Sequence, residues 1–122
     1  GDDLACDIET TGLNFLTDTI MSIAFSTRKG NWVIPIFHRE SPFTEEEAAS
    51  ILLTHVNWVL ENKNNRKILQ NCKFDMKFLL KYGIVPSNVY DTKIMAHLYN
   101  EVLPKSLMDL VKLFFPEELE NF

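Results

Sequence analysis

The 122 residues, 46% of them hydrophobic, suffice for one globular core but not for two ordinary domains, so we expect a single domain over residues 1–122. The net charge of −5 argues against nucleic-acid binding through a broad basic surface, but it does not exclude a nucleic-acid enzyme that receives phosphate through bound metal ions. No apolar run approaches the roughly 20 residues that cross a bilayer, and the N-terminus lacks a signal pattern. We therefore expect no membrane association and an unsecreted protein of the cytoplasm or an organellar matrix.

Three strands are predicted at the start of the chain. The first, Asp2–Ile8, is nearly continuously apolar, so we expect it at the sheet centre with both faces buried. It ends at a turn in which Gly12 can supply a positive φ. The second strand is predicted at Ile20–Thr27. A hairpin leads to the third, Trp32–Phe37, which belongs at a sheet edge because its proline cannot donate to a ladder.

Helices and strands alternate after residue 40. Thr44 and Glu47 form a capping box ahead of an amphipathic helix. A short strand is predicted at 67–70, followed by a helix over Cys72–Tyr82 that Gly83 ends. The apolar stripe of the first helix consists of Ala48, Ile51, Leu52, Val56, Val59 and Leu60, with His55 on or beside it and partly buried.

The last third of the chain predicts one more short strand and two helices. An extended piece lies around Val89 and Tyr90, a helix runs from about Asp91 to Tyr99 with Asp91 as its N-cap, and Ser106 caps the final helix. Three antiparallel strands followed by alternating helices and strands predict an α/β fold, with a mixed sheet flanked by helices and the later strands parallel to the first. We interpret Trp32, Trp58 and the phenylalanines as core residues, and Cys6 and Cys72 as reduced core thiols.

Two carboxylates mark the end of the first strand. Residues i and i+2 of a strand point to the same face, so Asp7 and Glu9 crowd together and repel each other. A divalent cation resolves that conflict, and hard carboxylate oxygens suit Mg²⁺ or Mn²⁺. Such a pair arises often by chance, so its meaning depends on the rest of the chain.

A second polar cluster, from Gln70 to Asp75, joins the fourth strand to its helix. Taken alone, this cluster is better explained by a helix entry in which Asn71 caps and Asp75 favours the positive end of the helix dipole. Its order and distance from Asp7 and Glu9 give it a second interpretation.

Together, the two segments resemble the first and second motifs of the DnaQ-like 3′–5′ exonucleases, within the ribonuclease H-like superfamily. The proofreading domain of family A DNA polymerases is the closest match, and the resemblance runs from about Leu4 to Phe114. It implies a ribonuclease H-like fold and a module that removes nucleotides from the 3′ end of single-stranded DNA for a polymerase domain in the same or an associated chain. The matching residues are Asp7, Glu9, Thr10, Leu13, Asn71, Phe74, Asp75, Asp91 and Thr92.

The resemblance also implies roles for these residues. Asp7 would bridge two divalent ions, Glu9 would bind one of them and help to orient the attacking water, and Asp75 would hold the second. These three are the expected catalytic and metal-binding residues. Four others, Thr10, Leu13, Asn71 and Phe74, are expected to bind the substrate, with Leu13 as a wedge against the terminal base.

The family's third motif, Tyr-x-x-x-Asp or His-x-x-x-x-Asp, has no counterpart in these residues. We therefore expect a C-terminally truncated domain, because the chain ends without a natural terminator and starts with a glycine that resembles a cloning remnant. Such a fragment should bind metal weakly and hydrolyse poorly. Two alternatives remain open: an RNase D-like exoribonuclease with the same metal-binding pattern, and a non-catalytic exonuclease-like domain.

Overall fold

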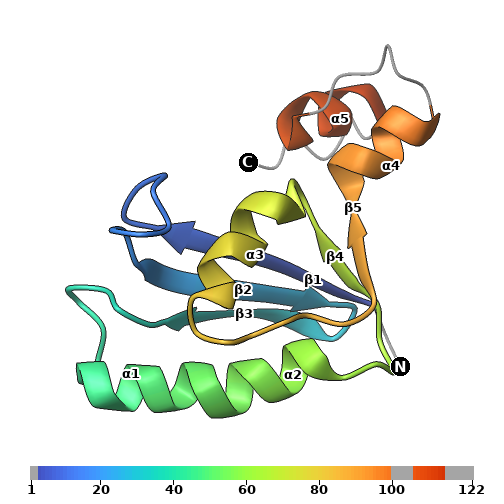
Figure 1. The fold of residues 1–122 in the computed structure, drawn as a ribbon. Coiled ribbons are helices and arrows are strands. Elements are labelled where there is room, and N and C mark those ends of the chain that lie inside the picture. Colours follow the sequence, from blue (N-terminus) through green and yellow to red (C-terminus); the bar gives the residue numbers. More distant parts are fainter. Residues whose placement is uncertain (1–2, 100–105, 115–122) are drawn as a thin grey trace.

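A computed structural model describes residues 3–99 and 106–114, and these contain a sheet of five strands in the order β3-β2-β1-β4-β5 (Figure 1). Strand β2 is antiparallel to both β1 and β3, whereas β4 is parallel to β1 and β5 is parallel to β4. The predicted α/β mixed sheet with a central first strand is confirmed. The strands are β1 (Leu4–Thr10), β2 (Ile20–Thr27), β3 (Gly30–Pro35), β4 (Lys67–Leu69) and β5 (Val89–Asp91).

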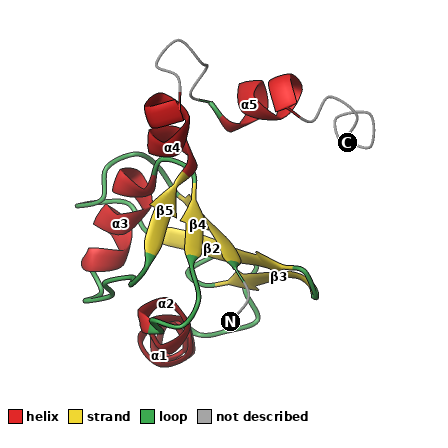
Figure 2. Cartoon of the chain, turned by 90° about the vertical axis from the view of Figure 1, so that its right-hand side faces the viewer, coloured by secondary structure: helices red, strands yellow, loops and turns green. Residues whose placement is uncertain are grey.

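The helices lie either on one side of the sheet or beyond its end. Figure 2 shows α1, α2 and α3 on the same side of the strands, while α4 and α5 extend past the sheet. This arrangement follows from the topology, because both crossovers into parallel strands, β1 to β4 and β4 to β5, run in the same direction. The helices are α1 (Glu45–Ile51), the π-helical segment η1 (Leu52–Val56), α2 (Asn57–Glu61), α3 (Cys72–Leu80), α4 (Thr92–Tyr99) and α5 (Leu107–Phe114).

Several predicted helix ends are confirmed. Thr44 and Glu47 form both bonds of the capping box at α1, at 3.1 and 3.2 Å. Gly83 follows α3 with φ of 75°, and the N–H of Ile84 donates to a carbonyl of the last α3 turn at 3.0 Å. At the start of α5, the Ser106 hydroxyl oxygen accepts a hydrogen bond from the Asp109 N–H at 3.1 Å.

A π-helical segment interrupts the predicted amphipathic helix. Its four buried residues, Ala48, Leu52, Val56 and Leu60, recur at every fourth position. In a regular α-helix of 3.6 residues per turn, that repeat drifts by about 40° at each step. The wider i→i+5 turns of η1 offset this drift and keep the four side chains facing the sheet.

The central strand β1 is buried on one face only. Leu4, Cys6 and Ile8 belong to the core cluster that also holds the buried side of α3, whereas Asp7 and Glu9 are exposed. The expectation that both faces of this strand are buried is therefore wrong for the part of the chain that the structure describes. The reason is that α1, α2 and α3 all cover the same face of the sheet.

Two of the residues assigned to the core lie elsewhere. Trp32 is 51% exposed and Trp58 is 72% exposed, and His55 is also exposed rather than partly buried. Trp32 belongs to the outer strand β3, where helix coverage of the sheet ends, and it lines a pocket of about 370 Å³ together with His55.

Phe25 and Phe78, by contrast, are buried as expected, and Cys6 and Cys72 are free thiols. Within residues 3–99 and 106–114, no helix is both long and apolar enough to span a bilayer.

Candidate active site

Three carboxylates lie near the end of the central strand and come from two different elements. Asp7 and Glu9 share the exposed face of β1, as their spacing predicts, and Asp75 comes from the first turn of α3. Asp75 is only 4% exposed, and its Oδ2 is buried without a hydrogen-bond partner among residues 3–99 and 106–114. A buried carboxylate oxygen in this state is costly unless a cation or a proton compensates it.

Burial and the charges of neighbouring acids raise the pKa values of Asp75 and Asp7. Burial, followed by the charge of Asp7, raises the pKa of Asp75 from 3.8 to about 7. Burial, followed by the charge of Glu9, raises the pKa of Asp7. Burial and the charges of Asp75 and Asp7 also raise the pKa of the Cys6 thiol to about 12. The site therefore holds more negative charge than its surroundings neutralise, which is the electrostatic setting of a cation site.

The carboxylates are not gathered into a finished metal site. In the described part of the chain, no three histidine, cysteine, aspartate or glutamate side chains are arranged to hold a metal ion. Asp7 and Glu9 leave β1 on the exposed face, whereas α3, which carries Asp75, covers the other face. The donor chemistry and the charge fit Mg²⁺ or Mn²⁺, but binding requires the side chains to converge or a further ligand to join them.

Asp91 connects the start of α3 to the start of α4. Its carboxylate is 7% exposed and accepts backbone N–H bonds from Asn71 at 2.9 Å, Cys72 at 2.8 Å and Lys93 at 2.9 Å. It thus caps α4, as predicted, and also caps α3. Leu69 pairs with Asp91 in the parallel β4–β5 ladder, which places the end of β5 beside the start of α3.

Asn71 does not cap α3 in the predicted way. It occupies the N-cap position in the left-handed conformation, with φ of 56° and ψ of 59°, and its side chain makes no capping hydrogen bond. The Asp91 carboxylate takes that role from 20 residues away in the sequence. The parallel register of β4 and β5 is the signal that could have revealed this contact.

The four expected substrate residues fall into two groups. Leu13 is 87% exposed on the loop after β1, and the Thr10 hydroxyl donates to the Gly12 carbonyl at 2.7 Å, which shapes the start of that loop. Asn71 is exposed at the start of α3. Phe74 is half-buried and packs against the core, with its ring centroid 5.2 Å from that of Phe78. Leu13 and Asn71 are therefore freely accessible, and Phe74 only in part.

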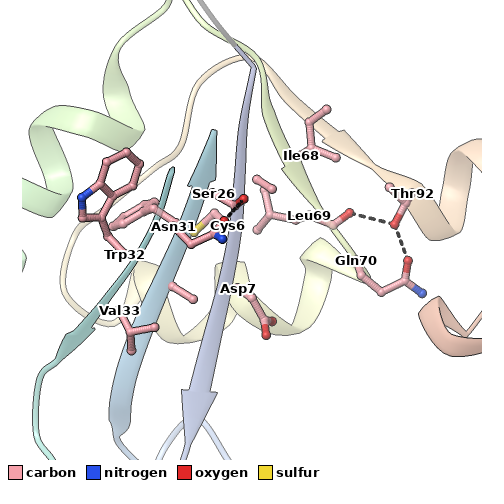
Figure 3. A pocket seen from close by; sticks show the side chains of 13 residues that line it. Cys6, Asp7, Ser26, Asn31, Trp32, Val33, Ile68, Leu69, Gln70 and Thr92 are labelled. Atoms are coloured by element: carbon pink, nitrogen blue, oxygen red, sulfur yellow. Dashed lines mark hydrogen bonds between the residues drawn. The ribbon is translucent and has the colours of Figure 1, made fainter. Parts of the chain in front are cut away.

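A pocket of about 480 Å³ opens on the uncovered face of the sheet next to Asp7 (Figure 3). Its floor is mainly apolar and comes from the four strands β1 to β4. At one side, the Thr92 hydroxyl donates to the Leu69 carbonyl at 3.2 Å and also contacts the Gln70 side chain. The pocket shares Asp7 with the carboxylate cluster, so any group seated in it lies beside the candidate site.

Known proteins share this sequence pattern and this fold. The model of a family described as 3′–5′ exonuclease matches residues 1–120. Among solved structures, Brucella melitensis NrnC with bound Mg²⁺ is 24% identical, with a TM-score of 0.71 over 94% of this chain and 54% of that one. NrnC has also been solved bound to pGG. The chain spans about half the length of these NrnC structures.

Two further structures share the fold at lower identity. Escherichia coli RNase D, described as an exoribonuclease involved in structured RNA processing, is 16% identical, with a TM-score of 0.70 over 93% of this chain and 28% of that one. The POL domain of Pol1 from M. smegmatis, in complex with DNA primer-template and dNTP, is 18% identical, with a TM-score of 0.66 over 92% of this chain and 18% of that one. These likenesses establish the ribonuclease H-like exonuclease fold.

Proposed function

The chain belongs to the 3′–5′ exonuclease family, and from that premise we propose that it is the proofreading module of a DNA polymerase. It would hydrolyse the 3′-terminal phosphodiester bond of single-stranded DNA with two Mg²⁺ or Mn²⁺ ions. The polymerase domain would lie in the same or an associated chain.

The observation that carries this proposal is the uncompensated charge at Asp75. Its buried oxygen lacks a partner in the described ranges, and the nearby charge of Asp7 opposes its ionisation. A purely structural acid at a helix start gains hydrogen bonds and a lowered pKa, as Asp91 does. Asp75 has a backbone hydrogen bond with Ile8, yet its Oδ2 lacks a partner within residues 3–99 and 106–114 and its pKa is raised, so its burial is better explained by a cation that joins it during function.

The residues divide the work as follows. Asp7, Glu9 and Asp75 would hold the ions, which would lower the pKa of a water and stabilise the leaving 3′ oxygen. Leu13 would press on the terminal base. A hydrophobic contact of this kind carries no base-specific hydrogen bond, so it suits an enzyme that must accept every terminal nucleotide.

The remaining substrate residues would guide the strand. Asn71 would line its path at the start of α3, the exposed part of Phe74 would border it, and Thr10 would act through the loop that its hydroxyl shapes. The third-motif pattern is missing from the 122 residues, so we expect the chain alone to hold metal weakly.

An exoribonuclease activity is the second candidate. It is favoured by the fold shared with E. coli RNase D, which is described as an exoribonuclease. A paired assay on single-stranded DNA and RNA of one sequence separates the two. A protein that shortens RNA and spares DNA recognises the 2′-hydroxyl, and it would contradict the DNA assignment.

We expect slow, Mn²⁺-dependent shortening of a 5′-labelled DNA single strand from its 3′ end. Asp7→Ala should lower the rate more than about 100-fold, since it removes a metal ligand. Glu40→Ala, which alters an exposed acid on the turn after β3, is the matched control and should keep the rate. A gel that resolves single nucleotides gives both the rate and the polarity.

Two results would count against this account. Shortening that Asp7→Ala leaves unchanged would contradict the assignment of the site. Brisk degradation that Asp7→Ala abolishes would instead show that the third motif is dispensable here, which contradicts the expected weakness of the chain.

A further inference from the structure

The loop that follows β1 is built around the side chain of Asp18. Within this β1–β2 loop, residues 11–19, the Asp18 carboxylate accepts from the Thr11 hydroxyl and from the Asn14 N–H, each at 3.0 Å. The Asp18 N–H donates to the Asn14 carbonyl at 2.7 Å. The N–H of Thr19 donates to the Thr11 hydroxyl oxygen, also at 3.0 Å. One side chain thus links the two ends of the loop to its middle.

Gly12 leaves the space that the Asp18 carboxylate occupies. A Cβ at Gly12 would lie 2.5 Å from Asp18 Oδ2 and 2.8 Å from Cγ. The positive φ expected for this glycine is wrong, because only Gly30 and Gly83 among the described glycines have positive φ. The sequence therefore uses glycine here for close approach to Asp18, which is a sign that the carboxylate has a fixed place.

The same loop is fastened to the helix that carries Asp75. The Lys81 ammonium, at the end of α3, donates to the Asp18 carbonyl at 2.9 Å. Phe15 packs against the core, and the Lys77 ammonium lies 5.9 Å from its ring centroid. These contacts tie the loop to α3, the helix that carries Asp75.

This ordered loop nevertheless exposes two large apolar side chains. Leu13 is 87% exposed and Leu16 is 72% exposed, although the Leu16 N–H is held by Asn14 Oδ1 at 3.0 Å. Figure 1 shows the loop in blue beyond the arrowhead of β1, the end of the strand at which Glu9 lies. Solvent-exposed apolar side chains on an ordered loop beside the carboxylates are available to a flat apolar ligand.

We propose that Asp18 is a positioning residue that holds Leu13 and Leu16 as a preformed apolar clamp for the 3′-terminal base of the substrate strand. This inference rests on the proposed function and adds Asp18 and Leu16 to it. The clamp binds the base through shape complementarity. Because the loop is already ordered, it loses little conformational freedom when the base binds. Without Asp18 the leucines remain, but the loop must be ordered by the substrate.

The test measures binding of two single-stranded DNA probes by fluorescence anisotropy, with Ca²⁺ in place of Mg²⁺. One 5′-fluorescein oligonucleotide ends in a normal 3′ nucleotide, and the other ends in an abasic one. The native chain should bind the normal end about tenfold more tightly. Asp18→Ala and Leu16→Ala should each lose most of this preference without weakening the abasic probe, since only the base contact is affected.

Two controls separate positioning from general damage. Leu80→Ala removes an exposed leucine from α3 and should keep the full preference. Asp18→Asn retains the size of the side chain and one acceptor oxygen, so it should show an intermediate preference. It replaces Asp18→Ala in the test if that variant does not fold. Hydrogen exchange without any DNA supplies a second readout, in which Asp18→Ala should speed exchange at the amides of Asn14 and Thr19 alone.

The possible results are distinguishable. A native chain that prefers the base-bearing end, together with folded Asp18→Ala and Leu16→Ala variants that keep the preference, overturns the clamp and leaves the proposed function standing. A native chain that binds neither probe overturns the proposed function, and the clamp with it. Loss of preference in both variants with normal abasic binding supports the clamp.

Discussion

Asp91→Ala is expected to lower the free energy of unfolding by about 3–5 kcal/mol, because it removes a buried charge and leaves three backbone N–H donors without their acceptor. Those donors belong to Asn71, Cys72 and Lys93, so the start of α3 and the start of α4 loosen together. Urea denaturation followed by circular dichroism measures the loss. Asp91→Asn, which keeps one acceptor oxygen, should lose less.

The effect of Asp91 should also depend on pH. Burial raises the pKa of this acid, but the bonds from Cys72, Lys93 and Asn71 outweigh burial and lower the pKa overall. An acid with a lowered folded pKa stabilises the fold above its unfolded value near 3.8, and that stability disappears as the pH falls through the folded pKa. A denaturation series in which Asp91→Ala costs no more than the exposed Glu40→Ala would contradict this role.

Asp75→Asn is expected to stabilise the metal-free protein at neutral pH, by up to about 4 kcal/mol. This figure corresponds to a pKa raised from 3.8 to about 7 in the folded state. Unfolded Asp75 ionises near 3.8, so between pH 4 and 7 folding must either retain a proton or bury a charge. The stability from this group is therefore full below pH 4, falls as the pH rises to 7, and stays low above it.

Asparagine mimics the protonated acid, so the variant should lack this pH dependence. The free energies of unfolding of the two proteins should agree near pH 4 and diverge steadily up to pH 7 in the presence of EDTA. Asp109→Asn changes an exposed acid on α5 and is the matched control. A variant that is less stable than the native chain at pH 7 would show that ionised Asp75 is favourably paired, against the present account.

Local patterns predicted the elements that local forces decide. Pro35 placed β3 at the edge of the sheet, Thr44 and Glu47 set the start of α1, and Gly83 set the end of α3. Each of these features depends on the geometry of one residue or one turn. The shared face of Asp7 and Glu9 follows in the same way from the two-residue period of a strand.

The features that escaped prediction depend on segments far apart in the sequence. Asp91 caps α3 because β5 lies beside β4, and Asp18 is fixed by a lysine 63 residues further along. The exposed face of β1 escaped because apolar composition does not say which faces the helices will cover. The π segment η1 follows from a strict four-residue repeat, which an ordinary helical pattern conceals.

The candidate site was predictable in its residues but not in its state. The motif resemblance named Asp7, Glu9 and Asp75, and their roles remain predictions. The structure adds that Asp75 is buried with an unpartnered oxygen in the described ranges, and that the three acids are not yet gathered around an ion. Asp7 and Glu9 lie on the exposed face of β1 whereas α3 covers the other face, and the like charges repel one another unless a cation compensates them.

The central claim is that these carboxylates form a divalent-cation site, and a Mn²⁺ titration followed by thermal unfolding tests it most directly. The unfolding temperature of the native chain should rise as Mn²⁺ is added. The rise should reach several degrees at a Mn²⁺ concentration about 100-fold above the dissociation constant. Asp75→Asn and Asp7→Asn should each abolish most of this rise, while Asp109→Asn should retain it. An equal rise in all four proteins would contradict the claim, because the cation would then bind elsewhere.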